Sequence, residues 1–216
     1  MAGFFNYDNP IITTINKIVD MILLSIVYVI LCIPIITIGP ATTALYYAVV
    51  KNVRRERSYP FREFFKSFKE NFKQGLIVNL LFIIIYLVLY VDIQFAKHMT
   101  GTTATIFSGI FFGLVILAIA VNMHVYPYLS RFEVTIKQLF KNSFFLAMRH
   151  LPSTIFMMII LGAGLFLTWI IPITLFFTPA LVVLLQSLFI ERIFKKYMPE
   201  KSDKAASQGI DQWYLE

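Results

Sequence analysis

Long apolar runs separated by short polar and basic segments make up most of the chain. The runs cover residues 18–38, 75–95, 104–126 and 155–190. Because about 20 apolar residues cross a hydrocarbon core about 30 Å thick, each of the first three runs predicts one transmembrane helix. The fourth run would extend about 54 Å as one straight helix, which exceeds the thickness of a bilayer. We therefore expect it to fold back on itself.

The turn in the fourth run is expected near its two prolines. Pro172 and Pro179 remove backbone donors in the middle of the run, and Trp169 is suited to a membrane interface. The run therefore divides into two spans, at 154–171 and 174–190.

The pattern as a whole predicts an all-α fold, a polytopic transmembrane helical bundle of about five spans. Residues 1–198 are expected to form one transmembrane domain. Residues 199–216 are polar and are expected to form a disordered cytoplasmic tail.

Two segments outside the spans have the spacing of amphipathic surface helices. In residues 61–73, five phenylalanines recur at helical spacing on one side of the helix, and the basic residues occupy the other. These basic residues are Arg62, Lys66, Lys69 and Lys73. A lipid-surface anchor is the favoured interpretation, and docking of a partner protein is the alternative. Residues 132–147 repeat the pattern more weakly, and since each segment precedes two spans, a parallel duplication is a further hypothesis.

The composition agrees with a membrane protein, because 58% of the residues are hydrophobic and only 14% are charged. Nearly all Lys and Arg residues lie in three segments, 51–73, 131–149 and 192–204. Basic residues that flank spans stay on the cytoplasmic side, so all three segments and the C-terminus are predicted to be cytoplasmic. The expected location is the plasma membrane, with the lipid bilayer as the main partner.

The orientation of the N-terminus depends on residues 39–50. If the first span crosses once, the N-terminus lies outside, which is the favoured interpretation. If residues 39–50 return into the membrane as a half-helix, the N-terminus lies inside. Pro34, Gly39 and Pro40 interrupt the helix here, and broken helices at membrane depth are tolerated only against protein or water.

The sequence argues against several classes of function. The basic residues flank spans and form no groove-tracking surface, so nucleic acid binding is not expected. We expect no enzyme and no cofactor, because no catalytic motif is present and the three histidines lie apart. With one cysteine, Cys32, neither a disulfide nor a cysteine-based metal site can form within the chain.

Polar residues at predicted membrane depth are the candidate functional residues. They are Asp20, Asn79, Asp92, Asn122, His124, Gln186 and Glu191. Those near the ends of spans can reach the interface, and Asn79 and Asn122 can form hydrogen bonds between helices. The alternative hypothesis is that some of them line a path for a polar solute.

The interrupted helix is a second candidate. Its residues are Pro34, Gly39, Pro40, Thr42 and Thr43. One interpretation is a simple helix break at the interface. The other is a half-helix whose free amides face a substrate or partner.

Several short motifs resemble the YesL-like family of small bacterial membrane proteins. They are Asn9-Pro10 and the segments 31–34, 37–46, 61–68, 126–128, 131–133 and 149–152. Members of that family are often encoded beside sugar-uptake transporters and polysaccharide-degrading enzymes. The resemblance therefore implies an accessory or interaction protein of a carbohydrate-uptake system, with sugar-transporter subunits as partners. The alternative hypothesis is a small autonomous transporter of a polar solute such as a sugar.

Overall fold

The computed structural model describes residues 10–54, 59–98 and 101–197. In these residues the chain forms eight α-helices, three short 3-10 or π-helical segments and no strand, which confirms the all-helical prediction. The helices are α1 (Pro10–Cys32), α2 (Ile38–Ala48), α3 (Pro60–Glu70), α4 (Phe72–Lys97), α5 (Thr102–Leu129), α6 (Ile136–Arg149), α7 (Leu151–Ile170) and α8 (Thr178–Tyr197). The short segments are η1 (Ile35–Thr37), the π-helical η2 (Val49–Arg54) and η3 (Pro172–Phe176). Asn9 and the predicted tail, 199–216, lie outside the described residues.

Four helices in the described part of the chain are long and apolar enough to cross a membrane. They are α1 from Thr14 onward, α4, α5 and α7. The protein is therefore a multi-pass membrane protein. The predicted first span, 18–38, was too long at its C-terminal end, because the helix stops at Cys32, two residues before Pro34.

The predicted fifth span, 174–190, overlaps α8, whose helical limits differ from it. Residues Pro172–Phe176 form the 3-10 segment η3, and α8 begins only at Thr178. The helix then continues past residue 190 through Glu191, Arg192 and two lysines. Because of these charges, α8 is less apolar than the four helices above.

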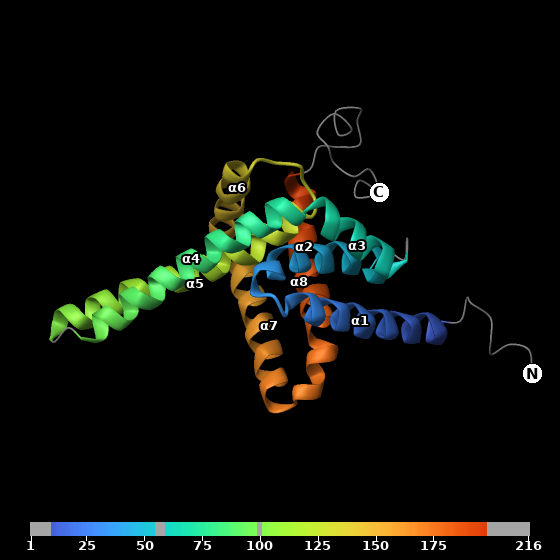
Figure 1. Ribbon diagram of the computed structural model, residues 1–216, viewed down its shortest axis with the longest axis horizontal. Coiled ribbons are helices and arrows are strands. Elements are labelled where there is room, and N and C mark those ends of the chain that lie inside the picture. Colours follow the sequence, from blue (N-terminus) through green and yellow to red (C-terminus); the bar gives the residue numbers. More distant parts are fainter. Residues whose placement is uncertain (1–9, 55–58, 99–100, 198–216) are drawn as a thin grey trace, which may run out of the picture.

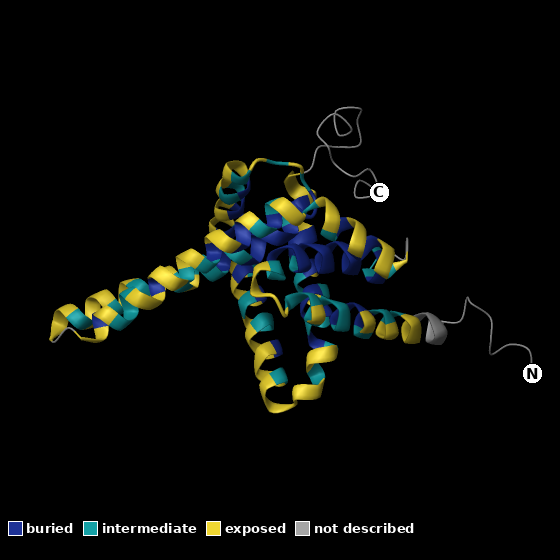
Figure 2. Cartoon of the chain, in the orientation of Figure 1, coloured by how far each residue is buried: buried dark blue, intermediate teal, exposed yellow. Residues whose placement is uncertain are grey.

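The helices radiate from a short central one. Figure 1 shows α2 at the centre, with α1, the α4–α5 hairpin and the α7–α8 hairpin extending from it in three directions. Helix α3 packs on α2, and α6 packs on α5. Figure 2 shows that the buried residues gather around α2, whereas the three arms are largely exposed.

The core follows from the composition of α2 and η2, whose small and aliphatic residues allow close helix contacts. Ala44, Ala48, Val49 and Val50 are completely buried there, and they pack against residues of α1, α3, α7 and α8. A second apolar cluster joins α4, α5 and α6 around Val78 and Val125. Together these clusters fix the inner ends of all three arms.

The break between α1 and α2 is closed by a side chain from α4. The amide of Asn79 donates hydrogen bonds to the carbonyl oxygens of Ile35, at 2.8 Å, and Ile36, at 3.2 Å. Tyr126 donates in turn to the Asn79 side-chain oxygen at 3.3 Å. Asn79 therefore accepts and donates across helices, and it binds two carbonyl groups at the break, of which that of Ile35 also accepts from the backbone N–H of Ile38.

Glycine allows α2 and α4 to meet backbone to backbone at this break. A Cβ atom on Gly39 would overlap the carbonyl oxygen of Gly75 and lie 2.8 Å from the Cβ of Asn79. A Cβ atom on Gly75 would lie 2.9 Å from the nitrogen of Pro40. The start of α2 is thus buried against α4, which favours a packing role for the interrupted helix.

The two threonines of the interrupted helix bond to their own helix. Thr42 donates to the carbonyl of Ile38 at 2.7 Å, and Thr43 donates to that of Gly39 at 3.0 Å. Gly39, Pro40 and Thr43 are buried. This local bonding is common for threonine in apolar surroundings.

The two predicted surface helices exist, with different limits. The first ends at Glu70, because Asn71 leaves helical geometry and its amide donates to the carbonyl of Ser67 at 3.0 Å. Lys73 therefore belongs to α4 and not, as predicted, to the surface helix. The second begins at Ile136 instead of 132, because a capping box formed by Thr135 and Gln138 starts α6 there.

Candidate functional site

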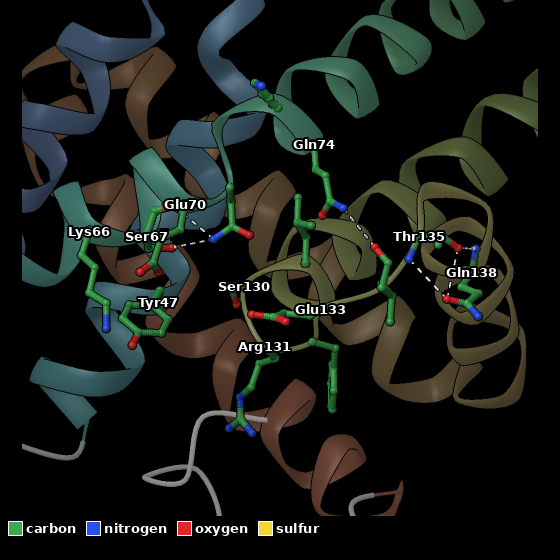
Figure 3. Close-up of a pocket in the computed structure, with 15 residues that line it drawn as sticks. Tyr47, Lys66, Ser67, Glu70, Gln74, Ser130, Arg131, Glu133, Thr135 and Gln138 are labelled. Carbon is green, nitrogen blue, oxygen red and sulfur yellow. Dashed lines mark hydrogen bonds between the residues drawn. The ribbon is translucent and has the colours of Figure 1, made fainter. Parts of the chain in front are cut away.

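A polar cavity of about 890 Å³ lies where α3 turns into α4 and where α5 connects to α6. Figure 3 shows the α3 residues on one side, the α6 residues opposite, and the α5–α6 connection between them. The polar and charged lining residues are Tyr47, Lys66, Ser67, Glu70, Asn71, Lys73, Gln74, Ser130, Arg131, Glu133, Thr135 and Gln138. We refer to this space as the polar cavity.

The walls of the polar cavity are held by hydrogen bonds between its own residues. Gln74, at the start of α4, donates to the carbonyl of Val134 at 3.1 Å, which joins the two sides. Asn71 is fixed by its bonds to Ser67, and Thr135 and Gln138 form the cap of α6. The cavity is therefore preformed, with amide, hydroxyl and carboxylate groups on its surface.

A buried ion pair lies beneath the polar cavity. Arg131 lines the cavity, and its guanidinium pairs with the carboxylate of Glu191 on α8. The hydroxyl of Tyr46 donates to the other carboxylate oxygen at 2.8 Å. All three side chains are buried, with exposed fractions of 2 to 3% for Tyr46 and Arg131 and 1% for Glu191. The guanidinium also lies 5.6 Å from the ring centroid of Phe194.

The ion pair and the Tyr46 hydroxyl together connect three parts of the fold. Tyr46 lies in α2, Arg131 directly after α5, and Glu191 in α8. Both ionised groups are removed from water, so each depends on the other and on the Tyr46 hydroxyl for compensation. The carboxylate balances the charge of Arg131, so the guanidinium adds no net positive charge to the cavity. The remaining charged residues at the cavity are two lysines and two glutamates.

A second ion pair lies beside the polar cavity. Lys51 in η2 pairs with Glu63 in α3 at 2.8 Å. The same ammonium donates to the hydroxyl of Tyr47 at 3.2 Å and lies over its ring. Nearby, Arg54 donates to the backbone carbonyl of Ser187 at 2.8 Å. The π-helical turn η2 thus positions Tyr47 at the cavity and connects α3 to α8.

The mixture of charges indicates what the polar cavity can do chemically. Its surface carries both hydrogen-bond donors and acceptors, and the positive and negative groups balance closely. Such a surface is suited to binding a polar group or an extended polypeptide segment through many hydrogen bonds. A site for a multiply charged anion would instead need a clear excess of basic groups.

The structure brings only two of the predicted intramembrane polar residues to one place, because Asn79 and Asn122 both interact with Tyr126. The side-chain oxygen of Asp20 accepts from Asn52 at 2.9 Å, and the amide of Gln186 contacts the carbonyl of Met157 at 3.4 Å. His124 is completely buried in α5, where its Nδ1 lies 2.9 Å from the carbonyl oxygen of Ala120. Asp92 in α4 and Asn122 in α5 are half-buried. None of these five lines the polar cavity, and neither does Asn79.

The predicted basic residues lie closer to the polar cavity than the intramembrane ones. Lys66 and Lys73 line it, whereas Arg62 and Lys69 are exposed on α3. The sequence marked Arg131 only as part of a basic flank, and it marked Glu191 as an intramembrane polar candidate near the end of a span. Their charge and their position beside apolar runs were visible in the sequence, but their pairing across 60 positions was not.

One part of the chain matches a known protein family. Residues 21–93 match the family described as "Protein of unknown function, DUF624". The DUF624 match extends from the middle of α1 to the end of α4, so it includes the interrupted helix, α3 and one wall of the polar cavity. Arg131 and Glu191 lie beyond the DUF624 match. No curated protein and no solved structure matches the chain.

The DUF624 match agrees with part of the resemblance noted from the sequence, because the family has YesL-like members. It covers the motifs at 31–34, 37–46 and 61–68. The motifs at 126–128, 131–133 and 149–152 lie outside it. A function is not attached to the DUF624 description, so the role of the protein has to be argued from the site.

Proposed function

We propose that the protein is a DUF624 member over its whole length and acts as an accessory or interaction component of a carbohydrate-uptake system in the plasma membrane. In this proposal it works by binding a partner and not by catalysis. One structural observation favours an accessory protein over an autonomous transporter. The polar cavity lies at one end of the apolar helices, whereas Asp20, His124 and Gln186 within them make separate contacts.

An autonomous transporter needs polar groups that line a route through the apolar helices. The contacts of Asp20, Asn79 and Gln186 are instead consistent with joining helices to one another. The polar cavity offers a preformed surface for a polypeptide segment, which supports an interaction role. The link to sugar uptake is supported by the YesL-like resemblance alone.

The structure supports a revised topology within this proposal. Tyr28 lies within hydrogen-bonding distance of Thr42, at 3.3 Å, and Asp20 bonds to Asn52. Thus α2 and η2 run antiparallel to α1, and the beginning of α1 lies at the same end as Lys51. If the basic segments are cytoplasmic, we propose that the N-terminus is cytoplasmic too, in place of the external position favoured from the sequence.

The experiment that tests the accessory role is site-specific photo-crosslinking in the native membrane during growth on plant polysaccharide. A photoreactive residue replaces Gln138, which lines the polar cavity and is exposed. The matched control replaces Lys141, which lies almost one turn further along α6, is also exposed, and does not line the cavity. Crosslinked proteins are then identified by mass spectrometry.

Recovery of sugar-transporter subunits from position 138, and much less from position 141, is the expected result. Equal recovery from both positions would indicate contact with α6 in general and would contradict a role for the polar cavity. Recovery of no transporter subunit would favour the alternative, autonomous transport. Sugar flux into liposomes containing the purified protein, and its loss in Asn122→Leu, would then support that alternative.

A further inference from the structure

A second cavity, of about 320 Å³, lies where α7 begins and α8 ends. On the α7 side it is lined by His150, Pro152, Ser153 and Phe156. On the α8 side it is lined by Phe189, Arg192, Ile193 and Lys196. It shares no lining residue with the polar cavity, and we refer to it as the α7–α8 cavity.

The α7–α8 cavity has a basic part and an apolar part. Arg192 and Lys196 are four positions apart, so they project from the same face of α8, and both are exposed. One turn before Arg192, the ring of Phe189 stacks on Phe156 of α7, with ring centroids 6.0 Å apart and an interplanar angle of 9°. The two cations therefore lie next to a flat apolar wall that is half exposed.

The charges around the α7–α8 cavity are of one sign. None of its lining residues is acidic. The neighbouring carboxylate, Glu191, is buried and pairs with Arg131. Arg149 lies close by, 5.6 Å from the ring of Tyr197, whose hydroxyl is 3.0 Å from Nε2 of His150. Within the described residues, the cavity therefore has a positive potential that no lining carboxylate cancels.

The pKa of the His150 imidazole is affected by this potential. Burial lowers the pKa of its imidazole, and the positive charges of Lys196 and Arg149 lower it further. The ring therefore stays neutral near pH 7, and Arg192 and Lys196 carry the charge of the cavity. This leaves two permanent cations and a neutral donor or acceptor.

The position of the α7–α8 cavity along the helices indicates its surroundings. Helix α7 is one of the four helices apolar enough to span a membrane, and it begins at Leu151, beside the cavity. The cavity thus lies at the end of a span, where lipid headgroups are found. Phe156, at 56% exposed, lies one turn deeper, at the level where acyl chains begin.

We propose that the α7–α8 cavity binds an anionic phospholipid, whose phosphate contacts Arg192 and Lys196 and whose acyl chain lies along Phe156 and Phe189. A cationic rim and an apolar wall at the end of a span are the two features that such a lipid requires. A soluble phosphate would use only the rim. The proposal depends on α7 lying in the membrane, but not on the role in sugar uptake.

The test measures lipid binding to the full-length protein in mild detergent by native mass spectrometry. The probes are phosphatidylglycerol, phosphatidylcholine and soluble glycerol phosphate. Arg192→Gln and Lys196→Gln each remove one cation from the cavity, and the matched control Lys195→Gln removes one from the adjacent exposed position. The double variant Arg192→Lys/Lys196→Arg keeps both charges.

The protein is expected to retain phosphatidylglycerol in preference to phosphatidylcholine. Each cavity substitution should weaken this binding about fivefold, and the two together about 25-fold. Lys195→Gln and the charge-preserving variant should bind almost as the parent protein does. Circular dichroism shows whether each variant is folded. If Arg192→Gln/Lys196→Gln does not fold, the single variants Arg192→Gln and Lys196→Gln still test the proposal.

Three results would each overturn the proposal. Equal retention of phosphatidylcholine would show that charge does not select the lipid. An equal loss in Lys195→Gln would show that the general charge of α8 acts, and not the cavity. Equal binding of glycerol phosphate would show an anion site without a lipid. None of these results depends on whether a sugar-transporter subunit is recovered by crosslinking.

Discussion

Arg131 and Glu191 show how much single residues matter in this fold, because each charge is buried and compensated by the other. We expect Arg131→Met to leave the carboxylate of Glu191 without its main partner and to lower the free energy of unfolding by about 3–5 kcal/mol. The double variant Arg131→Met/Glu191→Leu removes both charges and should recover most of that loss. Thermal unfolding of the purified protein in detergent measures both effects.

The comparison of these two variants is the control. A buried ion pair is often no more stabilising than an apolar pair of similar volume, whereas half of an ion pair is strongly destabilising. If Arg131→Met unfolds at the same temperature as the parent protein, the charges are not coupled as the structure shows. If the double variant is less stable than the single one, the cost arises from packing and not from charge.

Gly39 is the second position at which one residue decides local packing. A methyl group in Gly39→Ala would meet the backbone of Gly75 and the Cβ of Asn79, so α2 and α4 would have to separate. We expect a loss of about 1–3 kcal/mol in unfolding free energy. The matched control is Gly113→Ala on α5, where an added Cβ meets no atom within 4 Å. Equal effects in the two variants would contradict the close contact.

The contacts at these residues were only partly predictable from the sequence. The sequence marked Gly39 and Pro40 as a break and Asn79 as a residue that bonds between helices. It did not reveal that Asn79 bonds to the carbonyl oxygens at that same break, 43 and 44 positions away. Such pairings depend on how helices cross, and helical periodicity carries no information about that.

At the scale of elements, the start of α6 is defined by its capping box. The Thr135 hydroxyl oxygen accepts a hydrogen bond from the backbone N–H of Gln138, and the backbone N–H of Thr135 donates to the side-chain oxygen of Gln138. Thr135→Ala should destabilise the first turn by about 1 kcal/mol. Faster hydrogen exchange at residues 136–139, measured by mass spectrometry, is the expected result.

Thr135→Ser keeps the hydroxyl and serves as the matched control, with exchange close to that of the parent protein. If Thr135→Ala leaves exchange at the start of α6 unchanged, packing holds this turn and the cap does not. Because both capping residues line the polar cavity, faster exchange there would also loosen one of its walls.

The elements that the sequence predicted best are the long ones. α4 and α5 extend the predicted spans by two or three residues at each end. They were predictable because an apolar run of about 20 residues can cross a bilayer only with its backbone hydrogen bonds satisfied internally, as in a helix. α2 was the hardest to place. With 11 residues it is too short to span a membrane, yet nine of them are buried at the centre of the fold. Its role follows from its neighbours and not from its own composition.

At the scale of the whole molecule, the α4–α5 arm diverges from the α7–α8 arm (Figure 1), whereas α1 packs against α8 and η3. A bilayer imposes one common axis, and transmembrane helices usually tilt from it by no more than about 40°. Contacts at α2 and around Val78 fix the inner ends of the arms, and Ser25 of α1 bonds to Phe177 and Ala180 near the tip of α7–α8, whereas the outer end of α4–α5 is largely exposed. We therefore expect the bilayer to draw the outer ends of α4–α5 and α7–α8 toward each other.

This rearrangement can be measured by electron paramagnetic resonance with one spin label at Thr105 and another at Ile173, both exposed near the tips of their hairpins. The single native cysteine, Cys32, is first replaced by serine. The separation of the labels should be shorter in lipid nanodiscs than in detergent. The control pair, Ile159 and Leu188, lies within one hairpin and should keep its separation in both. An unchanged distance between the tips would mean that the protein keeps strongly tilted spans, because the contacts at α2 would then outweigh the common axis that the bilayer imposes.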